Sequence, residues 1–542
     1  MKVLIGNAWT YANGPLHIGH LSAYLPGDVI ARYHRAIGDD VYFVSGSDCH
    51  GTPVAIRARQ EGVPPQAICD RYHEEYRECF ERLAFSYDRY GKTTDGDHKD
   101  FVREFHGRMY ESRYVYEKEA PQAYCESCGN ALADRFVVGK CPECGAFARG
   151  DQCEGCGLVM DPENLVDPKC HTCGATPAFQ TTRHLFLALT ELLGPLTEYI
   201  DGHPEWRKNA SALSRRYLNE GLRDRALTRS IDWGIDVPKE GYSDKKIYVW
   251  FEAVLGYLSM CKAAAAERGA DFGEIFGEDS KHYYVHGKDN IPFHTIILPA
   301  LMLANGGRWR FPDEIVSSEF LTIEGRKIST SANWAVWVAD IAKRFHPDTI
   351  RYFLIANGPE RRDADFQWAE FMHKHNGEIL GAYGNLINRT LAFIAKYLGN
   401  KVPKPTGAGM PDLMAGKVKA AYGSIGARIA GGELKDALDE AFALVRYGNK
   451  FYDEETPWIT RNTDPDRCGA TINACVQLIA NLACLLKPFM PVSSETVLGW
   501  LGLDDLWSEK TVAAGYELPE VRPLFAKIER AAIDEEMARL GK

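Results

Sequence analysis

Cysteine spacing gives the strongest chemical pattern in the chain. Eight of the 15 cysteines form four Cys-x-x-Cys pairs within residues 125–173. One pair can offer two thiolates to a tetrahedral zinc ion, and two pairs complete a site with no open ligand position. We therefore predict two structural zinc ions, held by Cys125, Cys128, Cys141, Cys144, Cys153, Cys156, Cys170 and Cys173.

Other uses of these cysteines fit less well. A disulfide scaffold is typical of short secreted chains, and this chain has 542 residues. A redox role for one pair is disfavoured because the four pairs are clustered. Spacing leaves the pairing open between a sequential arrangement, first pair with second, and a nested one, 141/144 with 153/156. A glycine follows every pair, as knuckle turns favour: Gly129, Gly145, Gly157 and Gly174.

A second pattern, His17-Ile-Gly19-His20, follows an apolar segment and precedes a helical one. Two imidazoles one helical turn apart can both face the phosphates of a nucleotide, and a helix N-terminus adds free N–H donors and partial positive charge. Gly19 has no side chain, so a purine ring can lie flat on the backbone there. The alternative is a pair of half-exposed histidines on an ordinary helix.

A third pattern lies at residues 324–331, Glu-Gly-Arg-Lys-Ile-Ser-Thr-Ser. A glycine turn that carries the adjacent cations Arg326 and Lys327 and three hydroxyls predicts a mobile phosphate clamp. Taken alone, the segment is also typical of a solvated turn.

The elements around these motifs indicate an α/β fold. Residues 2–5 and 41–46 are predicted to be short buried strands, joined by a helix from about 20 to 37 that ends at Gly38. Further strands are expected at 247–251, 282–286 and 314–323. Such sheets bind ligands at the carboxyl ends of their strands, which is where the motifs lie. From about residue 373 onward only helical patterns remain, such as 380–398 and 435–452, with a loop at 399–411.

Composition limits the class of protein. Apolar residues make up 45% and charged residues 25%, as in globular proteins. We find no signal peptide and no run of 18 apolar residues, so we expect a cytoplasmic protein without a membrane span. The net charge of −11 argues against coating nucleic acid by bulk electrostatics, but it leaves room for local phosphate contacts.

Together, His17–His20 and residues 324–331 resemble the HIGH and KMSKS signatures of class I aminoacyl-tRNA synthetases, in the same order and about 300 residues apart. Within that class the chain resembles the methionyl-tRNA synthetases over nearly its whole length. Three positions depart from the pattern: Thr330 replaces the second signature lysine, and Val254 and Leu298 replace Pro and Trp. The stretches that carry the resemblance are 11–14, 46–53, 248–257, 286–294 and the cysteine-rich insert.

The resemblance implies a split Rossmann-type parallel sheet, an inserted zinc-binding subdomain and a C-terminal α-helical anticodon-binding bundle. It implies an enzyme that activates L-methionine with ATP to methionyl-adenylate and transfers it to the 3′ end of tRNA(Met) for elongation and initiation. Zn²⁺ and ATP-bound Mg²⁺ are the implied ions, and a monomer is expected because the chain ends soon after the bundle. The expected domains are 1–115 (first half of the catalytic domain), 116–225 (connective insert with zinc knuckles), 226–322 (second half), 323–372 (signature loop and stem-contact region) and 373–542 (helical anticodon-binding domain).

The resemblance also assigns residues. Catalytic roles fall to His17, His20, Arg326 and Lys327. The methionine pocket comprises Ala8, Trp9, Tyr11, Asp48, Trp250, Tyr257, Phe293 and His294, with Asp48 on the α-ammonium and Tyr257 or His294 donating to the sulfur. ATP contacts fall to Tyr11, Asn13, Gly19, Gly287, Asp289, Lys327 and Thr330, and anticodon contacts to Asn385, Arg389, Pro457 and Trp458. Relatives that carry only the inner four cysteines favour nested zinc pairing.

Less specific interpretations of the same residues stay open from the sequence. Trp250, Tyr257 and Phe293 have the spacing of core aromatics, Trp458 could be buried, and Asn385 could cap a helix. Two other functions also remain. One is a non-catalytic tRNA-binding paralogue, favoured by Thr330 and opposed by intact His17, His20 and Asp48. The other is a compact nucleotidyltransferase with the HIGH motif, which the zinc insert and helical domain oppose.

Overall fold

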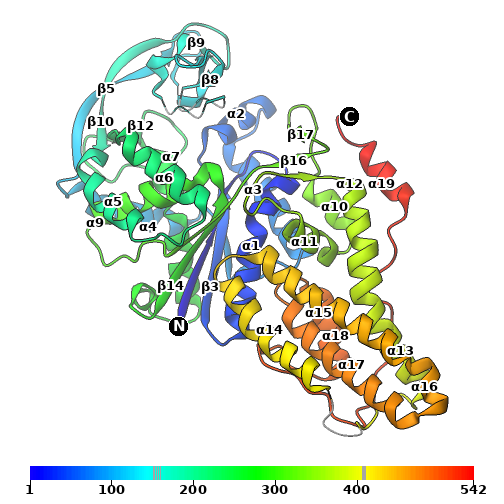
Figure 1. The fold of residues 1–542 in the computed structure, drawn as a ribbon. Coiled ribbons are helices and arrows are strands. Elements are labelled where there is room, and N and C mark those ends of the chain that lie inside the picture. The colour runs from blue at the N-terminus through cyan, green and yellow to red at the C-terminus, as the bar shows by residue number, and fades with distance from the viewer. Residues whose placement is uncertain (133, 151–152, 154, 157, 159, 406–409) are drawn as a thin grey trace.

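A parallel sheet of six strands forms the first part of the molecule (Figure 1). The computed structural model describes residues 1–542 except 133, 151–152, 154, 157, 159 and 406–409. The strand order is β15-β14-β1-β3-β2, with β4 beside β3. Strand β1 pairs directly with β14, so the sheet joins two segments that are far apart in the chain, as the split Rossmann prediction requires. The strands are β1 (Lys2–Asn7), β2 (Thr10–Tyr11), β3 (Asp40–Asp48), β4 (Arg89–Lys92), β14 (Ser280–Gly287) and β15 (Glu314–Ser318).

The first crossover of this sheet follows the predicted pattern. Strands β1 and β3 are almost entirely buried, and their central residues are mostly apolar, as expected for strands covered on both faces. Between them α1 (Ile18–Ala36) begins with His17 as its N-cap. It ends just before Gly38, whose φ of 89° is left-handed and therefore suits glycine.

A long antiparallel pair, β5 (Val115–Cys125) and β10 (Ala178–Leu187), carries the cysteine-rich insert away from the sheet. A small sheet in the order β8-β7-β9 lies at the tip of the insert, at the upper edge of Figure 1. Its strands are β7 (Val137–Lys140), β8 (Phe147–Arg149) and β9 (Val166–Cys170). The insert thus has its own sheet and its own small core.

Two strand predictions were wrong in detail. In the predicted strand 247–251, only the start is a strand, β13 (Lys246–Ile247). The single helical turn α7 (Val249–Ala253) follows it. Periodicity cannot separate a short buried helix from a buried strand, because both appear as short apolar runs. The segment 314–323 breaks at Phe320 into β15 and β16 (Leu321–Ile323), which belong to different sheets.

Helices alone form the regular structure described after residue 373. The predicted helix 380–398 begins as a π-helix, η7 (His375–Gly384), and continues as α13. The predicted loop 399–411 is described except for 406–409. The helices of the bundle are α13 (Asn385–Tyr397), α14 (Asp412–Ala430), α15 (Leu434–Glu455), α16 (Pro457–Thr463), α17 (Pro465–Leu486) and α18 (Pro491–Leu501).

Among the described residues, α17 is the one helix long and apolar enough to cross a membrane, with a mean hydropathy of 1.6. In this structure 89% of its apolar window is buried, as in the central helix of a soluble bundle.

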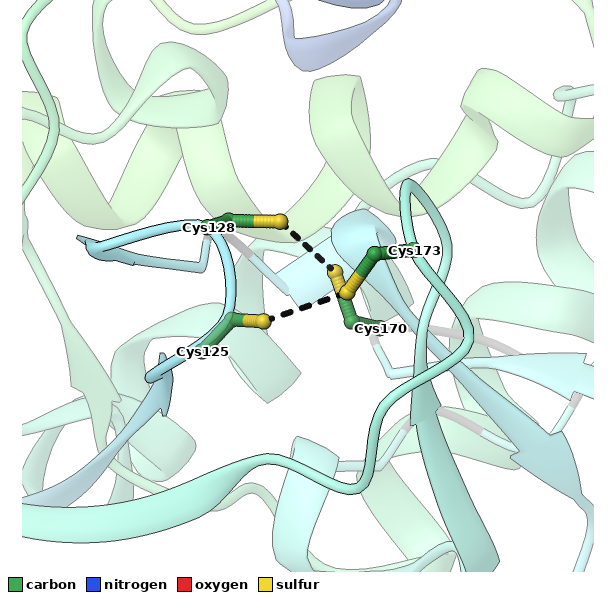
Figure 2. Close-up of side chains that lie close together, drawn as sticks. All are labelled: Cys125, Cys128, Cys170 and Cys173. Carbon is green, nitrogen blue, oxygen red and sulfur yellow. Dashed lines mark hydrogen bonds between the residues drawn. The ribbon is translucent and has the colours of Figure 1, made fainter.

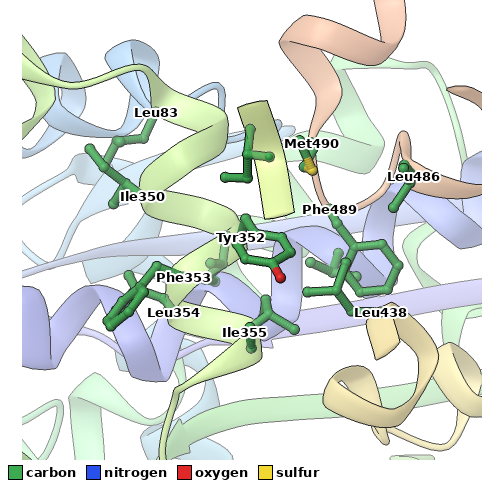
Figure 3. Packing of buried hydrophobic residues seen from close by; sticks show 14 of the residues in the cluster. Leu83, Ile350, Tyr352, Phe353, Leu354, Ile355, Leu438, Leu486, Phe489 and Met490 are labelled. Atoms are coloured by element: carbon green, nitrogen blue, oxygen red, sulfur yellow. The ribbon is translucent and has the colours of Figure 1, made fainter. Parts of the chain in front are cut away.

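The sheet domain and the bundle meet around α11 (Pro347–Ala356). Figure 3 shows its apolar side chains among Leu438, Leu486, Phe489 and Met490 of the bundle and Leu83 of the sheet domain. Arg351 of α11 is fully buried and donates to Asp28 on α1 (2.6 Å) and to the carbonyl oxygen of Phe489 (3.0 Å). The junction is therefore a packed core with a paired charge rather than a flexible linker.

Candidate active site

A cavity of about 420 Å³ opens at the carboxyl ends of β1, β3 and β14. Every residue predicted to bind methionine lines it except Ala8, which is buried behind it. Three residues predicted to bind ATP, Tyr11, Asp289 and Lys327, line the same cavity. Its walls are Trp9, Tyr11, Asp48, Cys153, Trp250, Ala253, Val254, Tyr257, Asp289, Asn290, Phe293, His294, Phe320 and Lys327.

Asp48, the last residue of β3, puts a buried carboxylate on this cavity. Burial, and after it the charge of Glu252, raises the pKa of Asp48 well above its usual range. Its Oδ1 accepts from the backbone N–H of His50 (3.3 Å). A carboxylate that is costly to ionise in isolation is stabilised when a cationic ligand binds beside it.

Behind Asp48 lies a buried pair that the sequence analysis missed. His50 Nδ1 is 2.8 and 3.1 Å from the two carboxyl oxygens of Glu252. Burial lowers the pKa of His50 to about 3 and raises the pKa of Glu252 well above its usual range, so both groups are harder to charge here than in water. A lone acid inside the apolar run 249–255 was the sequence signal for Glu252.

Hydrogen bonds within the protein engage the protons of His294 and Tyr257 in the cavity wall. His294 Nδ1 donates to the carbonyl oxygen of Asn290 (2.8 Å), so its Nε2 accepts from the Tyr257 hydroxyl (2.8 Å). Burial lowers the pKa of His294 to about 4, which keeps the ring neutral. In this arrangement neither group has a proton left for a sulfur atom, contrary to the prediction. His294 is the second residue of a π-helix, η6 (Phe293–Ile297), an element common at functional sites.

Large rings surround these groups. The Trp9 ring fills the space beside Gly46 and Gly256, where a Cβ would lie about 2.4 and 2.3 Å from its atoms. Trp250 and Phe293 meet edge to face at 5.0 Å. These aromatics line the cavity, and Trp9 and Phe293 also pack against the core of the sheet domain, to which Tyr257 belongs.

The two histidines of the first motif lie at the start of α1 with their rings stacked at 3.7 Å. The backbone N–H of His17 donates to His20 Nδ1 (3.2 Å), which leaves the His20 Nε2–H as a donor. Burial lowers the pKa of His17 to about 4 and that of His20 well below its usual range. Both rings are therefore neutral at pH 7 and can act on phosphate as N–H donors, not as cations.

The signature loop (residues 324–331) lies over this helix start. Its Lys327 lines the cavity, whereas the Arg326 guanidinium stacks on Trp334 at 3.8 Å. A Cβ on Gly19 would meet Ile328 Cδ1 at 2.9 Å, so the loop now covers the surface predicted for the purine. The loop must withdraw Ile328 before a base can lie there.

The remaining predicted ATP residues lie nearby but outside the cavity wall. Thr330 is exposed, and its carbonyl oxygen accepts from the N–H of Asn333 (3.2 Å). Gly287 precedes the short turn η5 (Lys288–Asn290) and so caps it, with Asp289 inside the turn rather than at its cap. Asn13 follows β2, and its N–H donates to the carbonyl oxygen of Tyr11 (2.8 Å).

The cysteines gather in two clusters, in the nested arrangement. Cys125, Cys128, Cys170 and Cys173 form one and Cys141, Cys144, Cys153 and Cys156 the other, with all sulfurs of a cluster within 4.8 Å. Figure 2 shows the first, with Cys125–Cys173 at 3.4 Å and Cys128–Cys170 at 3.9 Å. A tetrahedron with Zn–S bonds of about 2.3 Å has sulfurs about 3.8 Å apart, so the geometry fits zinc.

The turns of these clusters also follow the prediction. Gly129, Gly145 and Gly174 have φ of 69°, 71° and 74°. Gly157 lies outside the described residues. Cys153 reaches the wall of the active-site cavity, which ties the second cluster to the site.

An exposed aromatic group marks the far end of the bundle, opposite the insert in Figure 1. Trp458 is 45% exposed and stacks on Tyr452 at 6.0 Å, so it is not a core residue. The Arg389 guanidinium also lies over Tyr452, at 4.1 Å, and donates to Asp453 (2.7 Å). Asn385 is exposed one turn earlier on α13, and Pro457 is buried in the first turn of α16.

A further contact that sequence reasoning missed joins the insert to the sheet domain. Arg229 donates to Asp134 (2.8 Å) and lies over the Tyr248 ring at 3.9 Å. Nothing in the spacing of the two residues pointed to this pair.

Comparisons with known proteins agree with this geometry. Residues 3–391 match the family model of class I tRNA synthetases (M), and residues 412–541 match that of the anticodon binding domain of methionyl tRNA ligase. The methionine–tRNA ligase 1 of Alkaliphilus oremlandii is 47% identical and that of Bacillus mycoides 49%, each over 100% of this chain and 100% and 99% of theirs.

A solved structure of Mycobacterium tuberculosis methionyl-tRNA synthetase in complex with methionyl-adenylate shares the fold. Its TM-score is 0.79 at 24% identity, over 97% of this chain and 100% of that one. The matches cover both the sheet domain with its cavity and the helical bundle. The chain belongs to the methionyl-tRNA synthetases, the class I ligases that join methionine to tRNA.

Proposed function

We propose that methionine binds in the 420 Å³ cavity with its α-ammonium on Asp48 and its side chain among the aromatic rings. The observation that carries the proposal is the meeting of one buried carboxylate, several aromatic faces and Lys327 in one cavity. A charge-assisted bond to Asp48 fixes the amino group. Because the protons of Tyr257 and His294 are engaged, sulfur–aromatic contacts carry the recognition of the thioether.

ATP binds beside methionine over the start of α1. The neutral N–H of His20, together with His17, donates to phosphate oxygens, and the helix N-terminus adds its partial charge. Lys327 and Arg326 of the signature loop neutralise the β- and γ-phosphates with ATP-bound Mg²⁺, and Thr330 adds a hydroxyl. The base lies on Gly19 after Ile328 withdraws, and the ribose on Asp289, with Tyr11, Asn13 and Gly287 around it.

Adenylate formation requires the protein mainly to position the two substrates. The methionine carboxylate is already ionised, so it attacks the α-phosphorus without a general base, and pyrophosphate leaves in line. The protein stabilises the charge that develops on the phosphates. The adenylate then passes its acyl group to the 2′-hydroxyl of the terminal tRNA ribose.

Each cysteine cluster would hold one zinc ion, whose chemistry here is to fix the fold of the insert. Four thiolates per cluster leave no ligand position for substrate. Because Cys153 also lines the cavity, the second cluster shapes the active site from outside.

At the other end of the molecule, Trp458 and Arg389 would contact unpaired anticodon bases, helped by Asn385 and by Pro457, which sets the start of α16. Exposed aromatic and guanidinium groups suit single-stranded RNA. We further propose a cytoplasmic monomer that charges tRNA(Met) for both initiation and elongation. Size-exclusion chromatography with light scattering tests the monomer.

Methionine-dependent ATP–pyrophosphate exchange tests the active site. Lys327→Ala should slow adenylate formation far more than Thr330→Ala, because Lys327 lines the cavity and Thr330 does not. Methionine affinity should change little in either variant. The reverse order of severity would show that position 330 is the main phosphate contact, and no exchange in the unaltered chain would favour a non-catalytic paralogue.

A further inference from the structure

One residue next to the signature loop, Asn333, makes backbone and side-chain hydrogen bonds to three separate parts of the chain. Asn333 donates from its backbone N–H to Thr330 in the loop (3.2 Å), and its Oδ1 accepts from Trp337 Nε1 (2.9 Å). Its carbonyl oxygen accepts from the N–H of Gly541 (3.0 Å), and its Nδ2 donates to the backbone oxygen of Lys542. Asn333 therefore joins the loop to residues at the C-terminal end of the sequence.

The C-terminal segment (residues 530–542) reaches Asn333 along a fixed path. It begins with α19 (Arg530–Met537), which packs beside α12 (Trp368–Lys374) in Figure 1. Ile533 is buried, and Glu536, 4% exposed, accepts from Arg344 (2.7 Å). Gly541 then lies against Trp334, since a Cβ on it would be 3.4 Å from the indole.

The residues that receive these contacts also contact the loop and the histidine motif. Trp334 carries the Arg326 guanidinium on its ring, pairs its backbone with Ser329 in the loop, and donates from Nε1 to Ile323 (2.9 Å). Trp337 pairs with His17 in a β-bridge. Asn333 directly precedes Trp334 and accepts from Trp337, so it links the loop to the histidine motif.

We propose that the C-terminal segment positions the signature loop for adenylate formation, with Asn333 as the positioning residue that transmits the contact. The proposal rests on the phosphate role given above to Lys327. The loop covers Gly19 in this structure and must move away and return in each cycle, so a fixed anchor beside it determines where Lys327 comes to rest.

Asparagine suits this position for two reasons. Its φ is 47°, in the left-handed region that asparagine and aspartate tolerate better than most residues. Its amide can donate to Lys542 and accept from Trp337 at once. Asn333→Asp keeps the backbone preference and the acceptor for Trp337 but removes the donor to Lys542.

Asn400 provides a matched control. It also has a positive φ (60°), its Nδ2 donates to the carbonyl oxygen of Leu518 (2.5 Å), and its carbonyl oxygen accepts from the N–H of Leu518 (3.0 Å). This pair lies in the helical part, away from the signature loop. Asn400→Asp therefore removes the same kind of bond and adds the same charge.

The test is single-turnover adenylate formation in the full chain, with KM for methionine measured in exchange. Asn333→Asp should slow adenylate formation about tenfold, the effect of one lost hydrogen bond, and change KM for methionine less than about twofold. Asn400→Asp should leave both unchanged. Deleting Lys542 alone should slow the step similarly, and combining it with Asn333→Asp should add nothing further, because both remove the bond from the Asn333 amide to Lys542.

Three results would overturn the proposal: wild-type rates in Asn333→Asp, equal slowing in Asn400→Asp, or additive effects of the deletion and Asn333→Asp. Lys327→Ala run alongside separates this from the active-site assignment. A slow Lys327→Ala with a fast Asn333→Asp rejects only the anchor. A fast Lys327→Ala rejects the assigned role of the loop itself.

Discussion

The active-site cavity and the far end of the helical bundle use similar side chains in opposite ways. The cavity surrounds Asp48 and Tyr257 with protein, and burial shifts their pKa values. At the bundle end Trp458 is 45% exposed, and Arg389 is held over Tyr452 by Asp453. A small ligand gains most from a desolvated, preformed site, whereas a macromolecule brings its own surface to exposed rings.

The largest effect should come from the buried charge. Asp48→Asn keeps the shape of the side chain but removes the partner of the α-ammonium. Loss of a charge-assisted bond in a closed site should cost about 2–4 kcal/mol, or about 30- to 800-fold in kcat/KM for methionine. ATP–pyrophosphate exchange measures it, and wild-type exchange would show that methionine binds elsewhere.

The exposed end should respond differently to Trp458→Ala. Exchange should stay near the wild-type rate, because activation does not involve the bundle. Charging of tRNA should fall about 5- to 150-fold through lost base stacking, worth about 1–3 kcal/mol per base.

Thermal melting is the control for Trp458→Ala, since a buried tryptophan would cost about 3–5 kcal/mol of stability. With 45% of the side chain exposed we expect a nearly unchanged melt. Unchanged melting together with unchanged charging would remove Trp458 from the tRNA surface.

The two cysteine clusters of the insert should differ in how strongly their loss slows exchange. Metal analysis should find two zinc ions in the unaltered chain and one in either Cys125→Ser or Cys141→Ser. Cys141→Ser should slow exchange about tenfold, because Cys153 of its cluster lines the cavity, and Cys125→Ser should slow it less. Equal effects on exchange, or loss of both ions in one variant, would mean that the clusters are not independent.

The smallest effect should be a shift in pH dependence. Asp48 binds an ammonium group only when ionised, so methionine affinity falls as the pH drops through its raised pKa. Glu252→Gln removes the carboxylate that contributes to that rise, so the acid limb of kcat/KM for methionine should move to lower pH. A profile that stays in place would show that burial alone sets the pKa of Asp48.

Local chemistry and chain order allowed much of this to be predicted. The strand–helix–strand unit around His17 and the eight zinc-binding cysteines were predicted from residue types and spacing, whereas their nested pairing and the residues around the cavity were predicted from the family resemblance. Resemblance was needed for Trp250 and Phe293, because aromatic spacing alone cannot separate a cavity wall from a core.

What escaped prediction depends on contacts between distant segments. The pair His50–Glu252, the Arg229–Asp134 contact and the four bonds of Asn333 join residues that no local pattern connects. Proton positions also had to come from the structure. The sequence suggested that Tyr257 or His294 donates to sulfur, but the Asn290 carbonyl fixes the His294 tautomer and so directs the Tyr257 proton.

We propose that the active-site cavity activates methionine and that the far end of the bundle reads tRNA, as two separate regions. Exchange and tRNA charging measured side by side for Asp48→Asn and Trp458→Ala test it most directly. We predict that Asp48→Asn loses both activities, while Trp458→Ala keeps exchange and loses charging. Wild-type exchange in Asp48→Asn, or an equal loss of exchange in Trp458→Ala with an unchanged melt, would contradict the account.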